Sequence, residues 1–65
     1  MNLADVINQA KEREVYEATF AINEHWHITK SIGFFWYCDE NGEVYNNMSA
    51  VPLTYSNLRA DYELV

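Results

Sequence analysis

Residues 33–45 read Gly-Phe-Phe-Trp-Tyr-Cys-Asp-Glu-Asn-Gly-Glu-Val-Tyr, and this stretch decides the fold. An unbroken run of aromatic residues favours a β-strand, because such side chains fit a pleated, half-buried surface. The Asn41-Gly42 pair that follows is typical of a tight turn built on positive φ angles. Strand-like alternation resumes at residues 43–45. We therefore predict a β-hairpin over residues 34–46.

The first strand of this hairpin is apolar on both faces. Adjacent residues of a strand point to opposite faces of the sheet. Either Phe34, Trp36 and Cys38 face the core, or Phe35 and Tyr37 do. The remaining set then needs cover from a second sheet, a subunit or a ligand.

The N-terminal segment has the pattern of an amphipathic helix over about residues 2–13. Asn2 suits the N-cap, and Asp5 occupies the position of a capping-box carboxylate. Apolar residues follow at helical spacing and form one stripe, made of Leu3, Val6, Ile7 and Ala10. We expect this stripe to cover one face of the sheet.

Four further segments complete the expected layout. Residues 15–22 alternate with a period of two and residues 25–29 do so again, which predicts a hairpin. Thr54 or Ser56 suits the cap of one helical turn over residues 57–60. Residues 61–65 read as a last strand, with Tyr62 and Leu64 facing inward. The prediction is a single α+β domain over residues 1–65, with the N-terminal helix packed on a small antiparallel sheet of four to five strands.

The composition limits the classes of function. Only about 60% of the unfolded surface is buried by so small a domain, and one cysteine allows no internal disulfide. We therefore expect a homo-oligomer in the cytoplasm, without a secretory signal or a membrane span. Ten acidic residues against four basic ones give a net charge of −6, which disfavours nucleic acid as a partner. The acidity either steers the chain towards basic surfaces or keeps it soluble.

No arrangement in the sequence indicates catalysis. His25 and His27 share one strand face, as metal ligands do, but the sequence marks no third and fourth ligand except Glu24. Nothing in the sequence marks the Cys38 thiol as activated. The carboxylate pairs are interpreted as solvated turns and edges. We expect a protein that is not an enzyme and that holds no metal or cofactor.

The aromatic and polar residues suggest a ligand site instead. Four aromatic side chains are candidates to stack on a purine: Trp26, Trp36, Tyr37 and Tyr55. Arg59 is a candidate partner for a phosphate, and Asn57 or Asp61 for ribose hydroxyls. The alternative is that the aromatic rings fill the core and the subunit contacts.

The two ends of the chain resemble the Thoeris anti-defence sponge family of small phage proteins. Residues 2–7 resemble its opening helix, and Trp26 its early Trp. Residues 54–65, Thr-Tyr-Ser-Asn-Leu-Arg-Ala-Asp-Tyr-Glu-Leu-Val, resemble its closing pattern, with Asn57 where the family has Asp and Tyr62 where it has Trp. The resemblance implies a cytosolic homo-oligomer, a tetramer, that sequesters a cyclic ADP-ribose-type signal without degrading it.

Two functions follow as hypotheses. The first is a phage counter-defence protein that sequesters a nucleotide-derived immune signal as a homo-oligomer. The alternative is an acidic inhibitor that binds a basic host defence protein, in the manner of an anti-CRISPR or DNA-mimic anti-restriction protein. Both are small and non-catalytic.

Overall fold

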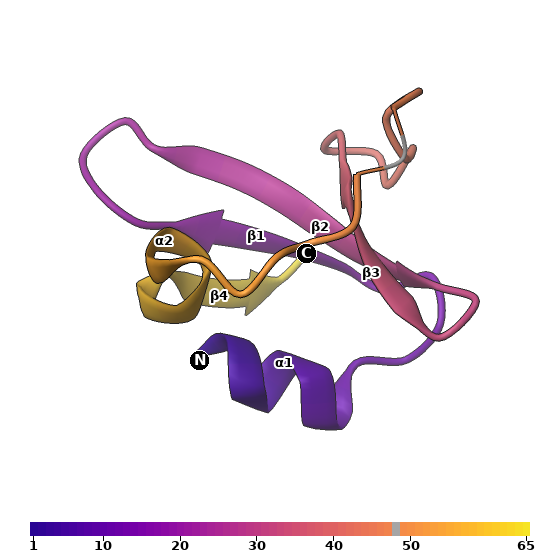
Figure 1. The fold of residues 1–65 in the computed structure, drawn as a ribbon, viewed down its shortest axis with the longest axis horizontal. Coiled ribbons are helices and arrows are strands. Elements are labelled where there is room, and N and C mark those ends of the chain that lie inside the picture. Colours follow the sequence, from indigo (N-terminus) through magenta and orange to yellow (C-terminus); the bar gives the residue numbers. More distant parts are fainter. Residues whose placement is uncertain (48) are drawn as a thin grey trace.

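The computed structural model describes residues 1–47 and 49–65 and has an α+β layout, which confirms the predicted class (Figure 1). Two helices and four strands follow in the order α1 (Leu3–Gln9), β1 (Val15–Thr19), β2 (His25–Ser31), β3 (Phe34–Cys38), α2 (Tyr55–Arg59) and β4 (Asp61–Leu64). The strands form one antiparallel sheet in the order β3-β2-β1-β4. The two helices lie on the same side of this sheet (Figure 1).

The central aromatic strand pairs with the strand before it. β3 follows β2 through a two-residue turn at Ile32 and Gly33, whose φ angles of 51° and 81° belong to a type I′ hairpin turn. The Glu12 carboxylate holds this turn by accepting hydrogen bonds from both of its backbone N–H groups, at 3.0 and 2.9 Å. The connection that joins residues 31 and 34 is therefore the hairpin turn of the aromatic strand.

The predicted hairpin over residues 34–46 forms only in part, next to its turn, where backbone hydrogen bonds run from the Asp39 N–H to the Glu43 carbonyl and from the Tyr45 N–H to the Tyr37 carbonyl. The chain does reverse after Cys38, but only the single bridge to Val44 forms there. The Asp39 carboxylate accepts hydrogen bonds from the backbone N–H groups of Asn41 and Glu43, at 2.9 and 3.0 Å. This side chain shapes a wider turn in which Gly42 has a positive φ and Asn41 does not. No second strand therefore follows within the described part of this segment.

The first helix is shorter than predicted, although its start is correct. Asn2 and Asp5 form the expected capping box. The helix ends at Gln9 because Ala10 has extended backbone angles and Arg13 has a φ of 73°. Ile7, expected on the buried stripe, is 47% exposed. The second helix begins one residue after Thr54, which is its N-cap.

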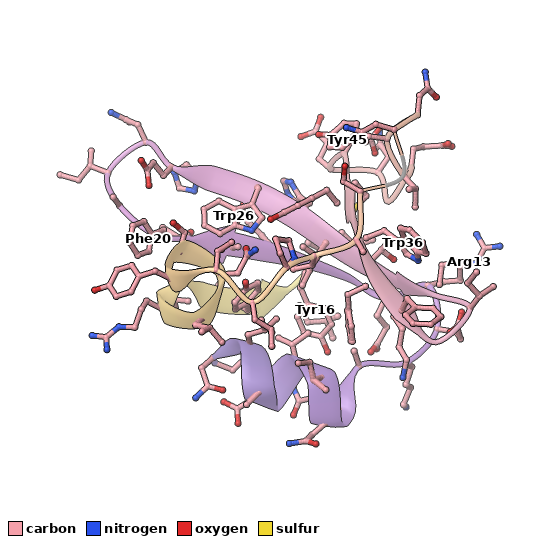
Figure 2. The ribbon with its side chains drawn as sticks, in the orientation of Figure 1. Arg13, Tyr16, Phe20, Trp26, Trp36 and Tyr45 are labelled. Carbon is pink, nitrogen blue, oxygen red and sulfur yellow. The ribbon has the colours of Figure 1, made fainter. Side chains whose placement is uncertain are left out.

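The face that the helices cover holds the core (Figure 2). Eight buried residues form it: Leu3, Val6, Ala10, Tyr16, Ala18, Ile28, Ala60 and Tyr62. Phe35 and Tyr37 pack against this core, so they are the inward pair of β3. Leu64 pairs with the core residue Tyr16 and so lies on the inward face, as predicted, but it is 52% exposed at the end of the edge strand.

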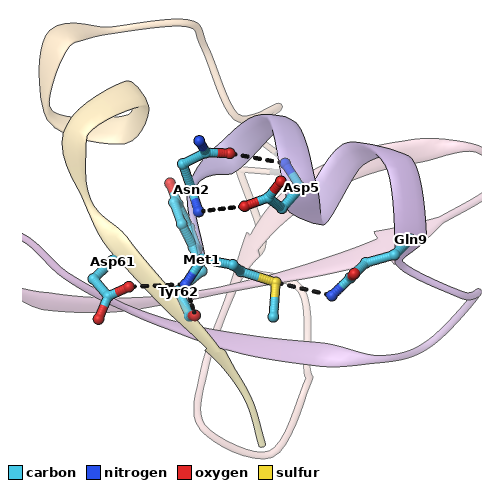
Figure 3. A network of polar contacts seen from close by, with 6 residues as sticks. All are labelled: Met1, Asn2, Asp5, Gln9, Asp61 and Tyr62. Carbon is cyan, nitrogen blue, oxygen red and sulfur yellow. Dashed lines mark hydrogen bonds and ion pairs between the residues drawn. The ribbon is translucent and has the colours of Figure 1, made fainter.

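Backbone groups at both edges of the sheet carry further hydrogen bonds. On the outer side of β3, the N–H of Tyr37 bonds to Ser49 and that of Val51 to Phe35. On the outer side of β4, Tyr62 exchanges two hydrogen bonds with Met1, whose ammonium group also pairs with Asp61 at 2.9 Å (Figure 3).

Candidate functional site

The seven residues predicted for a ligand site lie in four separate places. Trp26, Tyr37 and Asn57 lie on the helix side of the sheet, and Trp36 lies on the opposite face. The other residues are Tyr55 and Arg59 on the outside of α2, and Asp61, which pairs with the Met1 ammonium group. The structure therefore does not assemble them into one pocket.

Asn57 is the centre of a buried hydrogen-bond network. Its side-chain amide donates to the Tyr37 hydroxyl at 2.7 Å and to the Pro52 carbonyl at 2.9 Å. The backbone carbonyl of Asn57 accepts a hydrogen bond of 2.8 Å from the Tyr62 hydroxyl. Asn57 is 1% exposed, so its side chain tethers the segment before α2 to the sheet. Its polar groups are engaged within the chain.

Two aromatic side chains next to Asn57, Tyr62 and Trp26, are also shielded from solvent. Burial, with a smaller contribution from Tyr37, raises the pKa of the Tyr62 hydroxyl to about 12. The Trp26 indole packs against the core beside Tyr62, and its N–H has no hydrogen-bond partner among the described residues. These side chains belong to the core of the domain.

The outside of α2 carries an exposed aromatic cluster. Tyr55 is 70% exposed, and Phe20 meets it edge to face with ring centroids 5.9 Å apart. The Arg59 guanidinium lies over the same ring, 5.9 Å from its centroid. A planar ring next to a free cation is a group that can stack on a base and meet a phosphate.

The opposite face of the sheet holds a cleft that the sequence did not indicate. Strand pairing places Glu63 opposite Glu17, and Glu17 opposite His27. The turn after β3 adds Glu40 and Asn41 to this row. The resulting cleft has a volume of about 440 Å³ and is lined by Glu17, His27, Glu40, Asn41, Glu63, Leu64 and Val65. We call it the acidic cleft.

The charge of the acidic cleft defines its chemistry. Three carboxylates line it, and the described residues around it include no lysine or arginine. Glu17 lies 3.7 Å from the Nε2 atom of His27, and its side chain is 47% exposed. Like charges directly opposite on neighbouring strands repel each other, so Glu17 and Glu63 favour a cationic group between them. A phosphate would be repelled.

The nucleophile and metal-ligand candidates do not form a reactive site. Burial, with a smaller contribution from Asp39, raises the pKa of the Cys38 thiol to about 11, so the thiol stays protonated at neutral pH. His25 and His27 share one face, as expected from their spacing. Among residues 1–47 and 49–65, no group of three or more His, Cys, Asp or Glu side chains is placed to hold a metal ion.

Comparisons with known proteins found no matching family model, no similar curated protein and no similar solved structure. The resemblance to the Thoeris sponge family therefore stays a prediction. No helix in the described part of the chain has the length and apolar character needed to cross a bilayer.

Proposed function

We propose that this protein is a small, non-catalytic inhibitor that binds a basic surface of a host nucleic-acid-binding protein through its acidic cleft. The observation that carries the proposal is the lining of the cleft by Glu17, Glu40 and Glu63. Carboxylates held at fixed spacing present negative charge as a phosphate backbone does, and they attract lysine and arginine side chains. The net charge of −6 adds long-range attraction to such a partner.

The binding chemistry is tested with an oligo-arginine peptide as the probe. Calorimetry and amide chemical shifts are expected to show binding at the cleft that weakens as salt is added. Glu17→Gln and Glu63→Gln should each weaken binding about threefold, since an exposed ion pair contributes up to about 1 kcal/mol. Glu24→Gln is the matched control, because it removes the same charge from an exposed turn outside the cleft. Equal weakening by all three variants would contradict a defined site.

The inhibitor role needs a second assay. Proteins that the chain retains from a bacterial lysate are identified, purified and bound to labelled duplex DNA. The wild-type chain is expected to displace the DNA, whereas the double variant Glu17→Gln, Glu63→Gln is not. A retained protein that keeps its DNA in the presence of excess chain would refute the role as a nucleic-acid mimic.

The exposed aromatic cluster on α2 supports nucleotide sequestration as a second candidate function. Tyr55 and Arg59 are the two predicted ligand residues that lie together and open to solvent. Calorimetry with cyclic ADP-ribose isomers tests this candidate, with Tyr55→Ala and Arg59→Gln as the variants. An absence of heat at high micromolar ligand would reject it.

A further inference from the structure

One side chain in the acidic cleft can carry the same sign of charge as the proposed partner. Among the described residues that line the cleft, His27 is the one whose side chain can become a cation. Its imidazole is 19% exposed, and its Nε2 atom lies 3.7 Å from a carboxylate oxygen of Glu17. This distance is too long for a hydrogen bond but short enough for an ion pair once the ring is protonated. His27 therefore lies where a basic partner would place its charge.

Acidic side chains surround this imidazole from the neighbouring elements. Glu17 lies directly opposite on β1, and the buried Cys38 lies directly opposite on β3, where its thiol keeps its proton at neutral pH. Glu63 on β4 faces Glu17 one strand farther away, and Glu40 comes from the turn after β3. On β2 itself, His25 lies two residues away on the same face. The three glutamates thus place negative charge around the ring.

A proton on this ring changes the charge of the cleft. Histidine is the type of side chain that gains a proton between about pH 8 and about pH 5. Three glutamates give −3 when His27 is neutral, and one added positive charge makes the sum −2. The added charge lies beside Glu17, one of the two carboxylates that face each other across β1 and β4. A cation that enters the protonated cleft meets a like charge and one fewer free carboxylate.

We propose that His27 is a built-in competitor for the cation that binds the acidic cleft, so that a proton on its ring and a basic partner weaken each other's binding. This role rests on the proposed function, because it requires a cleft that takes a basic side chain. It adds the condition under which the cleft releases that side chain, namely acidification. Linkage makes the effect reciprocal, so the bound partner disfavours the protonated ring by the same factor.

Oligo-arginine binding at about pH 8 and about pH 5.5, measured by calorimetry, tests the competition. Guanidinium groups stay charged in this range and glutamate side chains as a class titrate below it, so histidine is the type that responds. We expect the wild type to bind about threefold more weakly at the lower pH, because one imidazolium offsets about as much charge as the loss of one glutamate. His27→Asn should bind with nearly the same affinity at both pH values.

His25→Asn is the matched control for this variant. It removes the other histidine of the chain from the same face of β2, and His25 is exposed and lies outside the lining of the cleft. The control should keep the change of about threefold between the two pH values. A control that loses the pH dependence as fully as His27→Asn would assign the response to the net charge of the molecule, and it would overturn the role of His27.

The reciprocal effect is measured on the wild-type chain and does not depend on the folding of a variant. The ring signals of both histidines are followed by NMR from about pH 5 to about pH 8.5, with and without saturating oligo-arginine. His27 should lose its proton at a pH about 0.5 lower in the complex, which is the threefold factor on a logarithmic scale, and His25 should change less. An unchanged titration of His27 in the complex would refute the competition.

The affinities at the two pH values separate this role from the proposed function. Binding at about pH 8 that is no weaker at about pH 5.5 refutes the competition and leaves the acidic cleft as a binding site. Binding that becomes tighter on acidification refutes it in the same way. A wild-type chain that binds oligo-arginine at neither pH refutes the proposed function, and the role of His27 falls with it.

Discussion

Asn57→Ala is expected to destabilise the domain strongly, because it removes the donor that joins three segments. The wild-type amide is 1% exposed and gives one hydrogen to Tyr37 and the other to Pro52. Alanine leaves both acceptors without this partner and opens a small cavity. Alanine is also the better helix former, so a loss of stability cannot come from helix propensity.

The magnitude follows from the two lost hydrogen bonds. An unpaired buried polar group costs about 1–3 kcal/mol, and the Tyr37 hydroxyl recovers part of this by turning towards water because it is only half-buried. We expect a loss of about 2–3 kcal/mol. A domain of this length has a stability of about 3–10 kcal/mol, so the melting temperature should fall by at least about 8 °C.

Urea denaturation separates the contributions of Asn57 and Tyr37 to the free energy of unfolding. The four proteins compared are the wild type, Asn57→Ala, Tyr37→Phe and the double variant. Tyr37→Phe removes a single acceptor and should cost about 1 kcal/mol. The double variant should be more stable than the two single losses together imply, by about 1 kcal/mol of coupling. A loss below about 0.5 kcal/mol for Asn57→Ala would refute the network and leave Asn57 free for a ligand role.

Three other perturbations have expected outcomes. Gly42→Ala should cost at least about 1 kcal/mol in urea denaturation, because the φ is 87° and the added Cβ would lie 2.8 Å from the Val15 Cγ2 atom. The Cys38 thiol, with its pKa raised to about 11, should react slowly with thiol reagents at pH 8. The contribution of this thiol to the free energy of unfolding is complete below its unfolded pKa near 9 and is lost as pH rises towards 11. Cys38→Ser should abolish this pH dependence in a pH titration of unfolding. Glu63→Gln should raise the melting temperature slightly while weakening oligo-arginine binding, because it removes a like charge opposite Glu17.

The sequence predicted those elements that depend on contacts between residues a few positions apart. The Asn2–Asp5 capping box, the Thr54 cap and the β1–β2 hairpin all depend on residues a few positions apart, and all three appear in the structure. The main partner of the aromatic strand was not predicted correctly, because either of two turns, at residues 32–33 or at residues 41–42, can join this strand to a neighbour. Asn41-Gly42 has the better turn sequence, but the Asp39 carboxylate binds its backbone. The strained Ile32 does not look like a turn residue, yet its turn forms.

The candidate site was harder to predict because it depends on contacts between distant segments. Glu17 alternates along β1 with the buried Tyr16 and Ala18, but only the pairing of β1 with β4 brings Glu63 opposite it. Asn57 has the chemistry of a ribose contact, and only the docking of α2 against Tyr37 shows that its hydrogen bonds are already satisfied. Residue type thus shows which polar groups the chain carries, whereas long-range pairing decides where they lie.

The bonded edges of the sheet have a consequence for assembly and for solubility. An open strand edge is a template on which another chain adds a strand, and it promotes fibre growth. Here segment 49–51 occupies the outer side of β3, and Met1 occupies the start of β4. A partner is therefore expected to recognise side chains rather than to extend the ladder. Asp61→Asn removes the ion pair with the Met1 ammonium group, which leaves only the two backbone hydrogen bonds to Tyr62 and should weaken the cover on β4. Slow aggregation would be the first sign of this weakening.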